Sequence, residues 1–139
     1  YLDKELSLEM MEKYIELFRT SQLPRLQKLK RYYDCKNDTI MNRTFKDITK
    51  PNNKIATAWA SYITTLTTGY FMGKPVTYHT DNNELNEYLH KSNTKEISHN
   101  AALEKDCSIF GYAAEILYIN ENKEIDFAKV DPMSIIPIY

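Results

Sequence analysis

Apolar side chains between residues 49 and 80 recur at steps of three and four residues, which is the spacing of one face of a helix. The repeating positions are Ile55, Ala58, Trp59, Tyr62, Ile63, Leu66, Tyr70 and Phe71. This pattern predicts a helix that packs along one side. We interpret its largest side chain, Trp59, as a core anchor, with a hot spot of a subunit interface as the alternative.

The ends of this helix are marked by residue types that start and stop helices. Asn52 or Asn53 carries a side-chain oxygen that can accept a hydrogen bond from a free N–H of the first turn. At the other end, Gly69 and Gly73 are predicted to end the helix, because glycine readily leaves the helical conformation. Pro75 then prevents the helix from resuming.

The first third of the chain is predicted to hold two helices and a long loop. Ser7 is the expected N-cap of the first helix, whose apolar positions are Leu8, Met11, Ile15 and Phe18. Because Pro24 lacks a backbone donor, a break or kink is expected at residues 21–23, before a second helix over residues 24–33. Its apolar side carries Leu23, Leu26 and Leu29. Residues 34–53 are polar and predict a loop with intermittent anchors at Ile40, Met41, Phe45 and Ile48.

The next part of the chain is predicted to contain a strand and two helices. A short strand over residues 76–80 precedes a helix over residues 82–92, whose inward side chains are Leu85, Tyr88 and Leu89. Thr94 is a candidate cap for the following helix, over residues 94–109, and Gly111 is predicted to end it. The apolar side of that helix carries Ile97, Ala101, Ala102 and then Cys107 or Ile109.

Alternating apolar positions towards the C-terminus predict strands. Residues 113–119 and 125–130 form a hairpin pattern in which residues 120–123 are the link. Asp131 and Pro132 predict a turn, and residues 135–139 are expected to begin a third strand. The predicted fold class is therefore α+β, with helices first and a small antiparallel sheet after them.

The length of 139 residues fits one domain, and folding at this size is expected to bury roughly 68% of the unfolded chain's surface. Hydrophobic residues make up 42% and charged residues 27%, which is ordinary for a soluble protein, and no apolar run approaches the about 18 residues of a membrane span. We treat the chain as a single unit, with a helical part over residues 1–49 and an α+β core over residues 50–139. The chain begins with Tyr1 and ends in an apolar run at Tyr139, so we expect an excerpt of a longer protein.

Charge is segregated along the chain although the net charge is only −1. Residues 19–54 hold ten Lys and Arg against three Asp, a balance of +7, and residues 81–131 hold eleven acids against five Lys, a balance of −6. The densest cations are Arg25, Lys28, Lys30 and Arg31. Three interpretations fit them: a surface that faces phosphates, a solvated helix face near the negative end of the helix dipole, or one half of a head-to-tail contact between the basic and acidic segments of successive copies.

Residue types that bind metals or catalyse reactions do not converge in the sequence. The histidines have no ligand spacing along a helix, and a run of acids and amides resembles a calcium loop but lacks its glycine and its final glutamate. These two sets are His79, His90 and His99, and Asp81, Asn82, Asn83 and Glu84. Cys107 and Ser108 have no nearby histidine to activate them, and Glu121 and Glu124 lie at a predicted hairpin tip. We therefore expect no enzyme, no cofactor and no metal.

The cysteines, the glycines and one aspartate further restrict the structures and functions that the sequence allows. Cys35 and Cys107 lie far apart and are expected to be reduced thiols, with a structural disulfide as the alternative. Only three glycines are present, which argues against a glycine-rich nucleotide-binding loop. Asp106, near the end of a predicted helix, is expected to be solvated, with pairing to a basic residue as the alternative.

Five blocks stand out by their order and spacing. They are KRYYD at residues 30–34, KPNNKI at 50–55, GYFMGKPVTY at 69–78, KDCSIFGYAAEILYIN at 105–120 and DPMSIIPIY at 131–139. Together they resemble the N-terminal part of the portal protein of tailed phages that infect Gram-positive bacteria. The resemblance covers the chain from about residue 7 onward and depends on the set of blocks rather than on any one of them.

The resemblance implies a structural subunit of a dodecameric ring at one vertex of the capsid, present in the virion and, during assembly, in the host cytoplasm. Double-stranded DNA enters through that ring, driven by the terminase motor, and later leaves towards the tail. The implied partners are other portal subunits, the terminase, head-completion or adaptor proteins, scaffold and capsid proteins, and DNA, with no membrane. This segment would form much of the outer wing, and the channel helix, the clip and the crown would follow residue 139.

Two positions depart from the pattern of that family. The turn after Asp34 usually carries glycine where this chain has Cys35, and the late hairpin lacks its usual glycine near Lys123. We expect these departures to affect the local shape of the turns and not the packed blocks. Structural roles, as sites of backbone freedom or as fixed changes of direction, are expected for Gly69, Gly73, Gly111 and Pro75.

Two other functions are open at this point. A stand-alone nucleic-acid-binding module would use Arg25, Lys28, Lys30 and Arg31, and its affinity for duplex DNA would fall steeply with salt. A catalytic domain would need its active residues beyond Tyr139.

Overall fold

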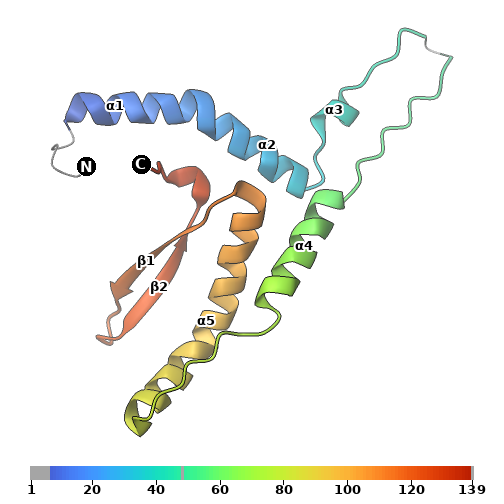
Figure 1. Cartoon of the computed structure of the whole chain (residues 1–139). Coiled ribbons are helices and arrows are strands. Elements are labelled where there is room, and N and C mark those ends of the chain that lie inside the picture. The colour runs from blue at the N-terminus through green and yellow to red at the C-terminus, as the bar shows by residue number, and fades with distance from the viewer. Residues whose placement is uncertain (1–6, 48, 139) are drawn as a thin grey trace.

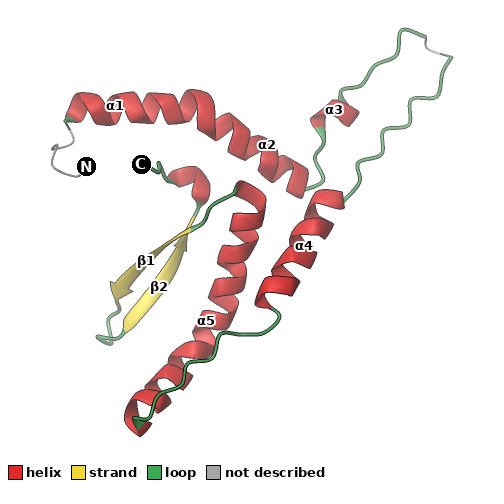
Figure 2. Ribbon diagram, in the orientation of Figure 1, coloured by secondary structure: helices red, strands yellow, loops and turns green. Residues whose placement is uncertain are grey.

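The computed structural model describes residues 7–47 and 49–138, and for residues 91–94 it describes the backbone alone. The elements follow in the order α1 (Leu8–Leu17), a π-helical turn (Phe18–Gln22), α2 (Leu23–Tyr33), α3 (Asp38–Met41), α4 (Trp59–Met72), α5 (Asn83–Phe110), β1 (Ala114–Ile119), β2 (Ile125–Val130) and a 3₁₀ turn (Pro132–Ser134). α1 and α2 form one bent rod, α4 and α5 run side by side beneath it, and the β1–β2 hairpin lies beside α5 (Figures 1 and 2). The helices and the small antiparallel sheet confirm the predicted α+β class.

A serine cap and a proline shape the N-terminal rod. Ser7 Oγ accepts a hydrogen bond from the Met10 N–H at 3.3 Å, which confirms Ser7 as the N-cap of α1. The irregularity expected at residues 21–23 is a π-helical turn rather than a break, because the Leu23 N–H bonds to Phe18 O and the helix continues through a bend (Figure 1). Pro24 then falls in the first turn of α2, directly after this π-helical turn, so the bend lies where the proline lacks a backbone N–H.

α2 ends in a residue with left-handed backbone conformation. The Lys36 N–H bonds to Arg31 O at 2.7 Å and the Cys35 N–H bonds to Tyr32 O at 3.1 Å, which is the hydrogen-bond pattern of a Schellman motif. Cys35 has φ 60°, a conformation that is costly for any residue except glycine. The turn thus keeps the shape that glycine favours although its residue is a cysteine.

A long exposed segment between α3 and α4 projects away from the helices (Figure 1). Its two sides are joined through Arg43, whose Nη2 donates to Asn53 O at 3.0 Å. Arg43 Nε also donates to Asn52 Oδ1 at 3.4 Å, and Asn52 Nδ2 donates back to Arg43 O at 3.1 Å. The prediction that Asn52 or Asn53 caps the next helix is therefore wrong: α4 begins at Trp59, after Ala58, and has no side-chain cap. The predicted anchor Ile48 lies outside the described residues.

The C-terminal end of α4 is set by Gly73. A Cβ atom at this position would lie 2.4 Å from the carbonyl oxygen of Gly69, so no larger residue fits without a shift of the backbone. Gly73 follows the last helical residue, Met72, as predicted, whereas Gly69 lies within the helix and does not end it. Pro75 lies two residues after Gly73 and is exposed.

α5 is one helix of 28 residues, and the prediction of two helices separated near Thr94 is wrong. Residues 83–110 contain neither glycine nor proline, so no residue in this span forces the helix to stop. Asn82 Oδ1 accepts a hydrogen bond from the Leu85 N–H at 3.2 Å and caps the first turn. Gly111 ends the helix, as predicted, and with φ 89° it does so in the left-handed conformation.

β1 and β2 pair in antiparallel register, from Ala114 opposite Val130 to Ile119 opposite Ile125, which confirms the predicted hairpin. The Lys123 N–H bonds to Asn120 O at 2.9 Å, and Lys123 has φ 62°. This is a tight turn followed by a left-handed bulge residue, a position at which glycine is usual.

Two other predicted strands do not form. Within the described residues the sheet has only the strands β1 and β2, and residues 76–80 and 135–138 are irregular. Tyr78 lies instead near α5, where the negative charge of Glu96 raises the pKa of the Tyr78 phenol. A strand needs a neighbouring strand for its backbone hydrogen bonds, and the described chain offers none at either segment.

The buried core lies where the N-terminal rod meets the C-terminal end of α5. It consists of Phe18, Leu26, Ile109 and Phe110, and Leu26 is only 1% exposed. Partly buried side chains pack around it: Leu23, Tyr33, Tyr112, Met133 and Ile136. Tyr112 Oη donates to Pro132 O at 2.6 Å, which ties the 3₁₀ turn to this core.

The core is small for the length of the chain. The solvent-accessible surface is 11667 Å², whereas a compact protein of the same mass, 16.4 kDa, exposes about 7,500 Å². The chain therefore buries about half of its unfolded surface, and the expectation of roughly 68% is wrong. The excess surface is where the candidate functional site lies.

Candidate assembly surface

The apolar face of α4 points away from the rest of the described chain. Trp59 is 64% exposed and Tyr70 is 82% exposed. The large exposed side chains on this helix are Trp59, Tyr62, Ile63, Leu66, Tyr70 and Phe71. The predicted periodicity is thus present, but the prediction that this face packs and that Trp59 is a core anchor is wrong for the chain alone. A contiguous exposed apolar face of this kind is typical of a contact surface.

Aromatic rings organise the two ends of this surface. The Trp59 and Tyr62 rings meet edge to face with centroids 5.8 Å apart, and the Tyr70 and Phe71 rings do so at 5.5 Å. A shallow hollow of about 310 Å³ opens between Ala58, Trp59 and Tyr62. Rigid aromatic side chains around a hollow can anchor a partner at low entropic cost.

The opposite face of α4 carries small hydroxyl side chains. Thr64 is its buried residue, and two neighbouring hydroxyls bond to carbonyl oxygens one turn earlier in the same helix. Thr65 Oγ1 donates to Ser61 O at 2.8 Å, and Thr67 Oγ1 donates to Ile63 O at 2.9 Å. These two hydroxyls are satisfied within the helix, whereas Thr68 Oγ1 on the same face is buried without a hydrogen-bond partner among the described residues, which is a cost of placing this face towards α5.

The basic cluster on α2 is partly neutralised by its own helix and by α3. Lys30 Nζ contacts Asp34 Oδ1 at 2.8 Å, and Arg31 forms an ion pair with Asp38. The hydrogen bond from Lys30 lowers the pKa of Asp34, and the hydrogen bonds from Arg31 lower the pKa of Asp38. These contacts favour the interpretation of a solvated helix face.

The remaining two cations of the cluster are exposed. Among the described residues neither Arg25 nor Lys28 forms an ion pair, although Lys28 Nζ lies 5.7 Å from the centroid of the Tyr32 ring. Tyr32 also lines a small hollow beside Trp59, so the structure brings the end of α2 next to the start of α4. Binding of phosphates by Arg25 and Lys28 stays a prediction.

An ion pair and a histidine–carboxylate contact hold the hairpin on α5. Lys129 Nζ contacts Asp106 Oδ2 at 2.7 Å, and His99 Nε2 contacts Glu115 Oε2 at 2.6 Å. Asp106 is only 7% exposed, so the expectation of a solvated carboxylate is wrong and the paired alternative is correct. The His99 ring also lies 4.3 Å from the Phe127 ring, between centroids.

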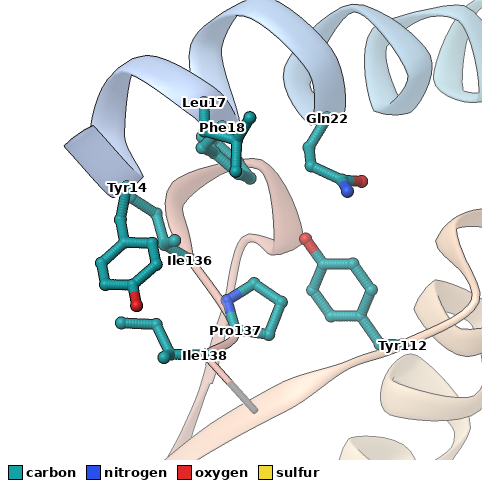
Figure 3. A pocket seen from close by; sticks show the side chains of 8 residues that line it. All are labelled: Tyr14, Leu17, Phe18, Gln22, Tyr112, Ile136, Pro137 and Ile138. Carbon is teal, nitrogen blue, oxygen red and sulfur yellow. The ribbon is translucent and has the colours of Figure 1, made fainter.

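A second hollow, of about 330 Å³, lies between the N-terminal rod and the C-terminal segment. Figure 3 shows its lining: Tyr14, Leu17, Phe18, Gln22, Tyr112, Ile136, Pro137 and Ile138. The polar atoms come from Tyr14, Gln22 and Tyr112, and the Tyr112 hydroxyl is already bonded to Pro132 O. No carboxylate, amine, guanidinium or imidazole is among these side chains, so the hollow has the character of an apolar packing gap.

Other candidate chemistry is scattered. In the part of the chain that the structure describes, no three His, Cys, Asp or Glu residues lie close enough to share a metal ion. Cys35 and Cys107 are both free thiols, and burial raises the pKa of Cys107. None of the described helices is both long and apolar enough to cross a membrane. The expected lack of a cofactor and a metal stays a prediction.

Sequence reasoning missed two surfaces. One is the hairpin, which exposes apolar side chains on both of its faces: Ile116, Leu117, Tyr118, Ile119 and Ile125. The other is the projecting segment before α4. Alternation along the chain predicted the strands, but only the positions of neighbouring elements reveal that five of the six residues of β1 are exposed.

Residues 12–139 match the family model described as phage portal protein, SPP1 Gp6-like. The chain is also similar to the portal protein of Bacillus phage SPP1, with 37% identity over 70 residues, which is 44% of this chain and 14% of that protein. Because the family model covers most of its length, the chain belongs to the phage portal protein family, a family of structural proteins and not of enzymes. It spans only a minor part of the length of the curated relative that it matches.

Proposed function

We propose that the protein is a subunit of the portal ring at one vertex of a phage capsid, and that residues 1–139 form a single wing-like unit of that subunit. In this role the ring confines double-stranded DNA to a central opening during packaging and ejection. The terminase motor, head-completion proteins, scaffold and capsid would dock on it. The mechanism is geometric and electrostatic, because the subunits form a rigid wall and make or break no covalent bonds.

The family match over residues 12–139 carries this proposal. The structure supports it through the area that the chain leaves exposed, since a subunit that is covered by neighbours needs less core of its own. The apolar face of α4, with Trp59 and Tyr70 at its two ends, has the aromatic-rich composition of the centre of a protein interface.

Electron microscopy of the complete protein, negatively stained, tests the proposal. We expect rings with a central hole, and class averages with twelve subunits would agree with the dodecamer that the family resemblance implies. Mass photometry of the same sample gives the number of subunits independently. A uniform population of monomers or dimers at micromolar concentration would contradict the proposal.

A further inference from the structure

A basic arm projects from one end of the molecule. The arm consists of residues 42–47 and 49–58, which join α3 to α4, and nearly all of its side chains are exposed. It extends away from the helices in Figure 1. Loops of this length without secondary structure are uncommon in compact domains, and they are usually either functional segments or linkers. The arm carries Arg43, Lys46, Lys50 and Lys54 against one acid, Asp47, a balance of +3.

The arm is held in shape by its own hydrogen bonds. Arg43 joins its two sides at the base, through Asn52 and Asn53. These partners are neutral, and among the described residues Arg43 forms no ion pair, although its guanidinium carbon lies 4.9 Å from the centroid of the Phe45 ring. Near the tip, Asp47 Oδ1 accepts hydrogen bonds from the Thr49 N–H at 3.1 Å and from Thr49 Oγ1 at 2.6 Å. An arm that is already ordered loses less conformational entropy when it binds a partner.

The complementary surface lies at the far end of the same chain. Residues 75–90 contain the acids Asp81, Glu84 and Glu87 and neither lysine nor arginine, a balance of −3. No ion pair to these three acids exists among the described side chains. Figure 1 places this segment, at the start of α5, at the opposite extreme of the molecule from the arm.

Apolar side chains accompany the charges on both surfaces. The arm exposes Phe45 and Ile55, and the acidic surface exposes Val76, Tyr78, Leu85 and Tyr88. An interface needs apolar contacts near its centre and paired charges at its rim, and these two surfaces together supply both. Because they are different surfaces at opposite ends, a contact between them is head to tail and can close into a ring.

We propose that the arm of one copy binds the acidic surface of the next copy, and that its cations pair with Glu84 and Glu87 of that neighbour. The inference rests on the proposed function as a ring subunit and names the surfaces that meet. A second copy is favoured over DNA as the occupant because a phosphate backbone would satisfy the cations but leave Phe45 and Ile55 exposed. It would also leave the matching acidic surface without a partner.

Charge reversal in the complete protein tests the pairing. One variant carries Lys46→Glu with Lys54→Glu, a second carries Glu84→Lys with Glu87→Lys, and a third combines all four. Mass photometry measures the subunit concentration at which half of the protein is in rings. We expect each double reversal to raise this concentration at least tenfold, and the combined variant to return to within about threefold of the wild type, because opposite charges then face each other again.

A matched control separates pairing from net charge. Lys13→Glu with Arg19→Glu reverses two exposed cations on the N-terminal rod and should leave the midpoint unchanged. Circular dichroism verifies that every variant is folded. The rise in the assembly midpoint that each double reversal causes should be smaller at 1 M NaCl, where charges are screened within about 3 Å.

Zero-length coupling of amines to carboxylates provides a second measurement. Mass spectrometry of carbodiimide-treated rings should find Lys46 or Lys54 joined to Glu84 or Glu87, and the same links should be absent from monomers.

Normal ring formation in both double reversals, or additive losses in the combined variant, would overturn the inference while leaving the proposed ring intact. Failure of the wild-type protein to form rings would instead contradict the proposed function. Loss of duplex DNA binding in the arm variant with unchanged assembly would assign the arm to DNA.

Discussion

Two residues other than glycine have the left-handed backbone conformation, which glycine adopts at a lower free-energy cost. Cys35 closes α2 with φ 60°, and Lys123 forms the bulge of the hairpin turn with φ 62°. These are the two positions where the resemblance to portal proteins leads us to expect glycine. The hydrogen bonds around each residue hold the conformation, including those that Asn120 Oδ1 accepts from the Asn122 and Glu124 N–H groups at 2.9 and 3.0 Å.

Glycine at these positions should stabilise the fold. The left-handed conformation costs an L-residue about 1–2 kcal/mol, and glycine loses part of this gain through its greater freedom in the unfolded chain. We expect Cys35→Gly and Lys123→Gly each to raise the free energy of unfolding by about 0.5–1 kcal/mol, measured by urea denaturation. Glu121→Gly, in the same turn but without positive φ, should lower it. If Lys123→Gly and Glu121→Gly lower the free energy of unfolding by the same amount, the bulge residue is not strained.

Asp34 at the end of α2 and Asp38 at the start of α3 should make the stability of the fold depend on pH. Hydrogen bonds from Lys30 and Arg31 lower the pKa of Asp34 and Asp38 in the folded chain. A lowered folded pKa gives stability that is complete above the unfolded pKa of about 4 and is lost as the pH falls through the folded pKa. Unfolding midpoints between pH 6 and pH 2 measure this loss. The Asp34→Asn, Asp38→Asn double variant should show a flatter profile below pH 4, and an unchanged slope would refute the assignment.

At the scale of elements, α4 shows how a correct pattern can lead to a wrong expectation of packing. The apolar spacing predicted a helix, and a helix forms over residues 59–72. The face that is buried in the chain is nevertheless the threonine face, with Thr64 inside and Trp59 outside. Helix periodicity identifies a face that is more stable when covered, but it does not state whether the cover comes from the same chain.

Substitutions at Trp59 and Leu26 should have opposite effects on assembly and folding. Leu26→Ala removes a side chain that is 1% exposed and should lower the free energy of unfolding by about 2–5 kcal/mol. Trp59→Ala should lower it by less than about 1 kcal/mol, because the indole is 64% exposed. The complete protein with Trp59→Ala should in turn form fewer rings by mass photometry. A loss of about 3–5 kcal/mol in Trp59→Ala would instead restore the interpretation of a core anchor.

At the scale of the whole molecule, the chain is an open unit. Its surface of 11667 Å² exceeds the about 7,500 Å² of a compact protein of this size. Exposed apolar side chains occur on α1, α4 and the hairpin as well as in the arm. This shape is consistent with a subunit that has neighbours on several sides, which is the role that we propose for this member of the portal family.

The small buried area should be visible in denaturant unfolding of the 139-residue chain. The m-value scales with the surface that unfolding exposes, and burial of about half rather than two-thirds of that surface predicts an m-value about a quarter smaller than is usual for this length. Urea titrations at low protein concentration, followed by circular dichroism, provide the measurement. An m-value typical of a compact domain of 139 residues would indicate that the monomer buries more surface than the structure shows.

The sequence by itself determined the local features and the family of this protein. Ser7 and Gly111 act as predicted because each acts on the backbone within a few residues of itself. The hairpin was predictable for the same reason, because its alternation and its turn are local. The order of the blocks along the chain indicated the family. Only the tertiary structure decided that α5 is continuous, that residues 76–80 and 135–138 lack a strand partner, and that α4 turns its apolar face outwards. These features depend on which surface lies next to each element, and a one-dimensional pattern of hydrophobic positions carries the preference for burial but not the position of the neighbour.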